Sequence, residues 1–537
     1  MIGSLLDECC IYFKLYFMAS KFLMVLTFLK TKVSLGFGIL CFLPAFLVAT
    51  NYTLNHFYVQ GCYLYDSGFL AYLQTHSLSW PMTSFPFLPE SVFFSIHIIP
   101  LFYILSYFHA FLNWLGIYIH NTVYFSLTLG VWLGMISVAT YSLFVTQEEN
   151  KRFWFFVVAC VIGVCAGLNG ITLASLGLPH FEFIIPGLLI VFFSFYVNGY
   201  NKTACFFLFL GLLAREDVGV HYFLFLFPLT VYLYNSQKIK NSDKHILFVG
   251  AVACFCLLYS TLAFLFQKMF YPEFSVAHSV YLGTPPFYHV TLSLLKERFV
   301  FYFQHRLYIV GPILIILIYS VLQKSIIMGV GILAAMPWLF FSWIAVGTNP
   351  GHLTSYYAFP LVVTLVWPVI SYRLDLLYGL RTERSLLWRL VFPGIAIVSS
   401  TLLFPGTGHI HDSTPQDKIG FEWCGRISST LKGLDDFLIA NEAKITFASD
   451  DAFTCMRSEK KSLKPWWRGL ELLDSEYNLI DTFIYLPDSR LQYVSVKNVL
   501  KRLKFPYYCR IEGTHFMVAT RLDALEHCNP QPHPLDQ

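Results

Sequence analysis

Charged residues are scarce in this chain, and their scarcity excludes a water-soluble globular protein. Only 13% of the 537 residues are Asp, Glu, Lys or Arg, whereas soluble domains carry about 25%. Hydrophobic residues reach 56%, and they gather in many runs close to the roughly 20 residues that cross a bilayer as a helix. The short alternating segments of a transmembrane β-barrel are missing. The composition therefore predicts a polytopic helical membrane protein.

Cysteine pairs are missing too. The chain has 13 cysteines but no Cys-x-x-Cys spacing that would indicate zinc. Most cysteines stand alone inside apolar runs, where a thiol side chain behaves as a small hydrophobic group. We therefore expect no disulfide framework. The sequence also lacks internal repeats and low-complexity tracts. The cysteines within apolar runs are Cys41, Cys160, Cys165, Cys205, Cys254 and Cys256.

The basic residues that are present lie in short clusters between the apolar runs, and short basic loops tend to stay in the cytoplasm. Placing every cluster inside gives a consistent alternation of about eleven spans, with the N-terminus inside and the C-terminus outside. A span over 93–117 would move Lys151 and Arg152 outside, so we expect a helix along the membrane surface there. The predicted spans are 33–50, 120–146, 153–170, 183–198, 202–214, 218–235, 245–267, 307–323, 325–346, 353–372 and 386–404.

Changes in composition divide the chain into three parts. Residues 1–32 interleave lysine with apolar residues, which predicts a cytoplasmic or interfacial segment. Residues 33–405 form the transmembrane domain, whose first external loop is 51–95. Residues 406–537 are polar and predict a small extracytoplasmic α/β domain. Its strands are expected in AKITFASD, NLIDTFIYLP and HFMVATRL, and an amphipathic helix is expected in SVKNVLKRLKF.

The predicted external loops carry ionisable residues beside apolar runs. Such a residue costs free energy at a membrane boundary unless it faces water, a partner or a ligand, so it indicates a functional site by default. Because these loops meet on one face, their side chains can line one cavity. The candidates are Asp66, His97, His180, Glu182, Arg215, Glu216, Asp217, His352 and Tyr356.

Each candidate also has a purely structural explanation. Asp66 can cap a short helix that starts at Ser67, because aspartate is a favoured N-cap residue. Arg215 and the two acids after it can form an ion-paired helix boundary. His352 can belong to an aromatic belt at the membrane interface. The other histidines can satisfy loop backbone, so these residue types alone leave both explanations open.

Several stretches, in this order, resemble a bacterial family of multi-pass membrane proteins of unknown function. They are YLYDSGFLAYLQTH, SIHIIPLFYILS, LGLPHFEFIIPGLL, LLAREDVGVHYF and GHLTSYYAFPL. The family shows Tyr-Asp-Leu-Gly, His-Pro-Glu and Lys-Glu-Asp signatures, and the resemblance covers approximately residues 34–525. Here Ser67 stands in place of Leu, Phe181 in place of Pro, and Arg215 in place of Lys. None of these departures removes a carboxylate.

The family is grouped with the GT-C superfamily of membrane glycosyltransferases, so the resemblance implies a GT-C-like fold. It also implies sugar transfer from a polyprenyl-phosphate donor to an extracytoplasmic lipid, glycan or protein. In that scheme Asp66 is the catalytic base, and Arg215 and His352 are candidates for holding the leaving phosphate. The remaining acids and His180 would hold sugar hydroxyls, a divalent cation such as magnesium or manganese, or Arg215 itself. His97 would orient Asp66. No recognised metal motif occurs, so no metal ligand is assigned.

Other functions compete with sugar transfer. A transporter or lipid flippase would use intramembrane charges along a substrate path, but such proteins often show inverted repeats, and none occurs here. A non-catalytic envelope assembly protein would use the external domain to bind a partner. In each case we expect an integral membrane protein of the bacterial inner membrane that contacts membrane lipids and no nucleic acid.

Overall fold

The structure, a computed structural model, describes most of the chain. The N-terminal segment predicted as interfacial lies outside the described residues, apart from its last residue. So does most of the stretch SVKNVLKRLKF. The described residues are 32–58, 66–79, 94, 96–145, 153–177, 179–235, 242–271, 281–323, 325–379, 386–405, 423–441, 443–449, 463–465, 480–486, 500–501 and 504–532.

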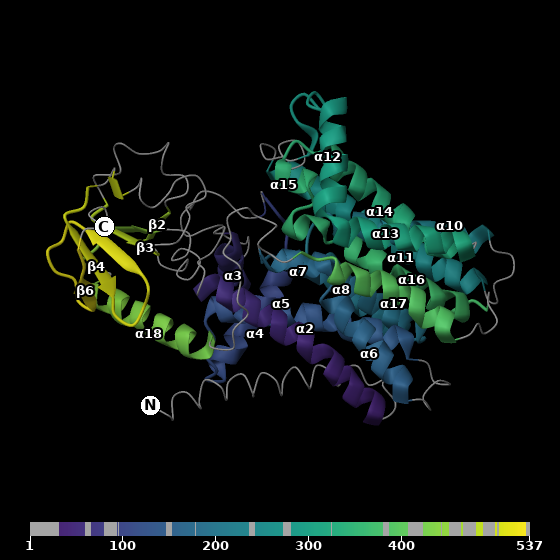
Figure 1. Ribbon diagram of the computed structural model, residues 1–537, viewed down its shortest axis with the longest axis horizontal. Helices are drawn as coiled ribbons and strands as arrows, with labels where there is room; N and C mark the ends of the chain where they lie inside the picture. Colours follow the sequence, from purple (N-terminus) through teal and green to yellow (C-terminus); the bar gives the residue numbers. More distant parts are fainter. Residues whose placement is uncertain are drawn as a thin grey trace.

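The described chain is mostly helical, and its apolar helices form one bundle (Figure 1). Each of the eleven predicted spans overlaps a helix. The bundle helices are α2 (Lys32–Tyr58), α5 (Asn121–Phe144), α6 (Phe153–Gly167), α7 (Gly170–Leu176), α8 (Ile184–Val197), α9 (Asn201–Leu212), α10 (Val218–Asn235), α11 (Ser242–Phe270), α13 (Leu307–Gln323), α14 (Ile326–Ile344), α16 (Leu361–Leu377) and α17 (Leu386–Leu402). Shorter elements join them: α3 (Asp66–His76), α4 (Leu101–Trp114), η3 (Phe181–Phe183), α12 (Leu292–His305), α15 (Thr348–Gly351) and η5 (Ser355–Ala358).

Six of the described helices are long and apolar enough to cross a membrane, and up to eight spans result if each of two bent helix pairs counts as one. Three further apolar helices, at Phe181–Val197, Asn201–Leu212 and Val391–Leu402, are shorter. A span needs about 20 residues, so length supports a membrane-embedded helical protein. The prediction of a polytopic helical fold is confirmed at that level.

Helix α5 forms the centre of the bundle, because 83% of its apolar window is buried, whereas only 22% of the α11 window is buried. Small residues allow the neighbouring backbones to approach closely, as in many membrane bundles. A Cβ added at Gly163 would lie 2.5 Å from the Cys41 sulfur, and one added at Gly134 would lie 2.5 Å from the Phe42 ring. Such contacts fix α2, α5 and α6 against one another.

Two short helices present apolar faces outward from the bundle. Helix α4 lies in the segment predicted to follow the membrane surface, and it exposes Tyr107, Phe108, Phe111 and Trp114. Helix α12 meets α13 at an angle of 91°. If α13 crosses the membrane, α12 runs along its surface, as an amphipathic interfacial helix does.

The C-terminal part is a small mixed sheet beside the bundle, with helix α18 (Trp423–Asn441) between them (Figure 1). The strand order is β2-β1-β3-β5-β4-β6. The three predicted strands correspond to β1 (Phe447–Ser449), β3 (Thr482–Tyr485) and β5 (Met517–Thr520). The sequence did not predict the other three, which are β2 (Leu463–Pro465), β4 (Tyr507–Ile511) and β6 (Cys528–Pro530).

A disulfide joins Cys509 on β4 to Cys528 on β6, two cysteines that lie outside the apolar runs and about which the sequence predicted nothing. The register of the strands explains the bond, because antiparallel pairing sets Cys509 beside Pro530 and Ile511 beside Cys528. The cysteines that the sequence placed in apolar runs are all free thiols.

Candidate functional site

Arg215, in the turn between α9 and α10, is the buried cation of a polar network. Its side chain is 9% exposed, and its Nε donates to Asp217 Oδ1 at 2.6 Å while Nη2 donates to the second oxygen of the same carboxylate. Nη1 donates to Glu182 Oε1 at 3.0 Å. This two-pronged contact is the geometry in which a guanidinium binds a carboxylate most strongly. The arginine is therefore compensated by two acids from different parts of the chain.

Glu182 connects this arginine to His180. The carboxylate is 1% exposed, and its second oxygen contacts His180 Nδ1. A neutral imidazole that donates from Nδ1 keeps Nε2 as a proton acceptor. The imidazole also stacks on the Tyr356 ring, with 4.1 Å between the ring centroids. Glu182 and Tyr356 therefore fix the ring from two sides.

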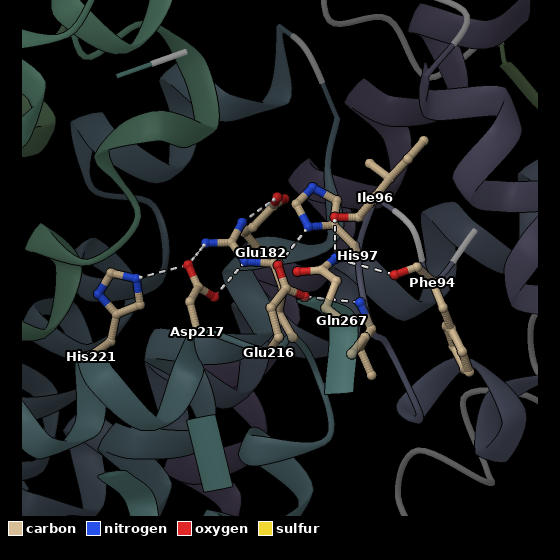
Figure 2. A network of polar contacts seen from close by, with 10 residues as sticks. Phe94, Ile96, His97, Glu182, Glu216, Asp217, His221 and Gln267 are labelled. Carbon is tan, nitrogen blue, oxygen red and sulfur yellow. Dashed lines mark hydrogen bonds and ion pairs between the residues drawn. The ribbon is translucent and has the colours of Figure 1, made fainter. Parts of the chain in front are cut away.

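Glu216 faces the opposite way from Asp217 and reaches the segment before α4. Its Oε1 lies 2.9 Å from His97 Nδ1, and its Oε2 accepts from the backbone N–H of Ile98 at 2.9 Å. Gln267, near the end of α11, donates to the carbonyls of Phe94 and Ile96 at 3.2 and 3.1 Å (Figure 2). Glu216 thus ties the start of α10 to the segment before α4, and Gln267 ties α11 to the same segment.

His221 completes the network on the α10 side. Its Nε2 lies 3.4 Å from Asp217 Oδ2, four residues earlier. The ring packs edge-on against Trp338, with 5.0 Å between centroids. The sequence showed His221 in this stretch but gave it no role, although a spacing of four residues places two side chains on one helix face. We name His97, His180, Glu182, Arg215, Glu216, Asp217 and His221 the acid–histidine cluster.

Burial and charge set the protonation of this cluster. Burial lowers the pKa of His180 well below its usual value, and the nearby His97 and Arg215 lower it further. Burial raises the pKa of Asp217, but the charge of Arg215 and the contacts with His221 lower it more, so the net shift is strongly downward. The pKa of Arg215 rises despite burial because Asp217 and Glu216 stabilise its charge. The cluster thus holds Asp217 ionised and His180 neutral at pH 7.

Asp66 is the first residue of α3, so the helix starts at this residue and not at Ser67. The side chain of Asp66 lies outside the described part of the structure. Its neighbour Ser67 is buried and donates from Oγ to the carbonyl of Pro179 at 2.8 Å. Pro179 directly precedes His180. This hydrogen bond therefore ties the start of α3 to the loop that carries the dyad of His180 and Glu182.

His352 lies apart from the acid–histidine cluster. Its ring stacks on Phe301 of α12, with 3.8 Å between centroids, and its Nε2 is 3.9 Å from Glu297. Tyr356, four residues later, reaches His180 instead. Of the nine predicted residues, the structure brings seven together around Arg215, sets the backbone of Asp66 close to them, and places His352 in different surroundings.

The arrangement of these side chains bears on metal binding. Among the described residues, no three His, Cys, Asp or Glu side chains are grouped so that they can hold a metal ion. The carboxylates turn toward Arg215, the imidazoles and the Ile98 amide instead. An apolar groove lies between the C-terminal ends of α10 and α13 and the N-terminal end of α14. It is lined by Tyr232, Val321 and Ile326 among others, and none of the predicted residues lines it.

Comparison with protein-family models finds no match for this chain, and comparison with curated proteins finds none either. The resemblance to a GT-C family stays a prediction.

Proposed function

We propose that the protein is a membrane glycosyltransferase that moves a sugar from a polyprenyl-phosphate donor to an extracytoplasmic acceptor. The observation that carries this proposal is the buried bond from Ser67 to the Pro179 carbonyl. It sets Asp66 beside a loop whose histidine and acid already share contacts with an arginine. Convergent ionisable groups at one end of a membrane bundle are expected at a substrate site, because burying them is costly.

The reaction would be a displacement at the anomeric carbon. Asp66, as general base, would accept the proton of the acceptor hydroxyl as that oxygen bonds to the anomeric carbon. The bond between this carbon and the phosphate oxygen breaks, and the electron pair leaves with the polyprenyl phosphate. The dyad of His180 and Glu182 offers an imidazole acceptor close to the same place. The hydroxyls of the sugar can then be held by Glu216 and His97.

The compensated state of Arg215 alters its proposed role. Two carboxylates already occupy its guanidinium, at 2.6 and 3.0 Å. An arginine held in this way orients its acids and has few donors left for a phosphate. We therefore assign Arg215 the positioning of Glu182 and Asp217.

The disulfide supports an extracytoplasmic site. Disulfides persist in oxidising compartments and are rare in the cytosol, so the sheet that contains Cys509 and Cys528 is expected outside. Helix α17 leads toward that sheet, and near its end Ser400 Oγ donates to the Tyr308 carbonyl in the first turn of α13. In this orientation the acid–histidine cluster would lie on the external side, as the prediction of eleven crossing segments requires.

Lipid and glycan mass spectrometry of a strain that lacks the protein, complemented with wild type or Asp66→Asn, tests the proposal. We expect the Asp66→Asn strain to lose the same glycosylated product as the deletion strain. Asp243→Asn is the matched control, because Asp243 is an exposed acid in the first turn of α11, the end of that helix far from Gln267. If Asp66→Asn restores the product fully, Asp66 is not the base, and an assembly or transport role is favoured.

A further inference from the structure

A second group of buried cations lies beside α15 and η5. Arg298 of α12 is 3% exposed, and Arg306, between α12 and α13, is 2% exposed. In the described part of the chain, neither guanidinium has a carboxylate within ion-pair distance. A buried charge without a counter-ion is costly, because it has lost its hydration without gaining an opposite charge. The two arginines therefore call for an anion.

Arg298 presents an unused pair of donors. Its Nη1 donates to the carbonyls of Ser342 and Trp343 at 3.3 and 2.7 Å, at the end of α14. Among the described residues no acceptor is hydrogen-bonded to its Nε or Nη2, which form the other edge of the guanidinium. Neither atom belongs to the fully buried polar atoms without a partner, so this edge keeps some exposed surface. Two parallel N–H groups on one edge match the oxygens of a phosphate. The orientation of the side chain is thus fixed by backbone, and its fork is left for a ligand.

Gly351 allows α15 to pack closely against this guanidinium. A Cβ added at Gly351 would lie 2.4 Å from Arg298 Cζ and 2.5 Å from Nη2. The backbone carbonyl of Gly351 accepts from the Tyr302 hydroxyl at 2.7 Å, which ties α15 to α12. No residue with a side chain can occupy this position without moving the arginine.

Arg306 supports the same site from the other side of His352. Its Nε donates to the His352 carbonyl at 2.9 Å, and its Nη2 donates to Thr354 Oγ1 at 3.3 Å. Burial lowers the pKa of His352, and the charges of Arg298 and Arg306 lower it further, while Glu297 opposes them. The side chain of Glu297 is 66% exposed and lies 3.9 Å from His352. It makes no ion pair with either arginine. The local charge is therefore positive.

The position in the fold indicates a lipid as the carrier of the anion. Helix α12 exposes Leu292, Phe299, Val300 and Phe303 and turns by 91° into the apolar α13. Such a helix lies at the depth of lipid headgroups. We propose that Arg298 binds the phosphate group of a membrane lipid, with the lipid chain in the bilayer. Arg306, whose three nitrogens already donate to His305, His352 and Thr354, adds positive charge beside it. If the proposed transfer reaction holds, on which this reading of the lipid rests, that phosphate belongs to the polyprenyl donor and product.

The loop from His352 to Tyr357 connects this phosphate site to the acid–histidine cluster. At one end of the loop His352 stacks on Phe301, whose ring lies under the Arg306 guanidinium. At the other end Tyr356 stacks on His180 of the cluster. Trp338 further anchors the loop by donating to the Tyr357 carbonyl at 2.7 Å. A lipid phosphate bound at Arg298 would thus lie at one end of a short loop and the proposed base region at the other.

Binding of defined probes to the full chain in phosphatidylcholine nanodiscs tests the inference. We expect a polyprenyl phosphate to bind at least ten-fold more tightly than the matching polyprenol. Inorganic phosphate should bind far more weakly than the polyprenyl phosphate. Arg298→Gln should weaken polyprenyl-phosphate binding about ten- to hundred-fold, the loss expected for charged hydrogen bonds, and Arg298→Lys should restore only part of it. Lys296→Gln removes an exposed cation from the same helix and should change nothing.

Each contrary outcome overturns a stated part. Equal binding of polyprenol and polyprenyl phosphate overturns the phosphate site, and inorganic phosphate binding as tightly as the lipid overturns the lipid assignment. A loss in Lys296→Gln as large as that in Arg298→Gln indicates surface charge alone. The comparison of probes on wild type needs no variant, so it holds even if Arg298→Gln does not fold. Asp66→Asn should bind normally, which separates failure here from failure of the proposed reaction.

Discussion

Two sites with buried arginines lie on either side of one loop, and different groups compensate the positive charge in each. Arg215 has two carboxylates within 3.0 Å, supplied by Asp217 and Glu182. Arg298 and Arg306 have backbone carbonyls and a hydroxyl instead. Carbonyl dipoles offset only part of a buried charge, whereas a carboxylate offsets a full unit. An arginine of the first kind builds the fold, and an arginine of the second kind is available to bind.

The largest expected effect comes from removing the first arginine. Arg215→Met would leave the buried carboxylate of Glu182 and the partly exposed carboxylate of Asp217 without their counter-ion. Breaking a buried pair in this way costs about 3–5 kcal/mol. We expect a large loss of thermal stability in detergent, measured by the fraction that stays monodisperse after heating. Arg298→Met should lose much less, because it leaves no acid behind. Equal losses in both variants would contradict the distinction between the two sites.

The next effect tests the position of the Arg298 guanidinium without changing any charge. Gly351→Ala keeps every charge but forces the Arg298 guanidinium to move, since the added Cβ would lie 2.4 Å from Cζ. We expect about a ten-fold loss of polyprenyl-phosphate binding, the scale of one charged hydrogen bond. Gly329→Ala is the control, because the closest atom to its Cβ is Ser320 Oγ at 3.7 Å. Unchanged binding in Gly351→Ala would mean that Arg298 does not hold the phosphate.

The sequence predicted the first site better than the second for a physical reason. An ionisable residue at a membrane boundary needs a partner, and the polar residues of neighbouring external loops are the partners available to one another. His97, His180, Glu182 and the acids after Arg215 therefore meet as the loop argument implied. The fold class followed from apolar runs in the same way, because a span needs a fixed length of chain.

The second site could not be predicted, because its burial depends on contacts distant in sequence. Arg298 and Arg306 occur in a long external loop, where arginines are ordinarily solvated. They are buried because α15 and the loop after it, roughly 50 residues later, pack against α12. The pairing of Cys509 with Cys528 was missed for a similar reason, since it depends on strand register.

A smaller effect is expected when pH is lowered across the acid–histidine cluster. Because the pKa of His180 is lowered by burial, the unfolded chain binds a proton near pH 6.5 that the folded chain does not. Stability is therefore present above about pH 6.5 and falls as pH drops, by at most about 1.4 kcal/mol per pH unit. The downward shift of Asp217 adds a loss only below about pH 4.

Thermal unfolding of wild type and His180→Gln between pH 7.5 and 5 measures this effect. We expect the wild type to lose stability as pH falls and the variant to show a flatter profile, because glutamine does not titrate. His515→Gln serves as the control, since His515 is an exposed histidine between β4 and β5 and does not belong to the acid–histidine cluster. Parallel profiles for wild type and His180→Gln would place the sensitive group elsewhere.

The smallest expected change in stability tests how the start of α3 is positioned. Ser67→Ala removes one buried hydrogen bond, to the Pro179 carbonyl, and should cost about 1 kcal/mol. Ser77→Ala removes an equivalent bond, to the Leu73 carbonyl at 2.6 Å, at the other end of the same helix. If Ser67 positions Asp66, its variant should lower kcat several-fold with little change in KM, whereas Ser77→Ala should leave both unchanged. A base displaced by a fraction of an ångström loses proton transfer before it loses substrate, which is why kcat should fall and KM should not. Equal kinetics in the two variants would show that the bond stabilises α3 without aligning the base.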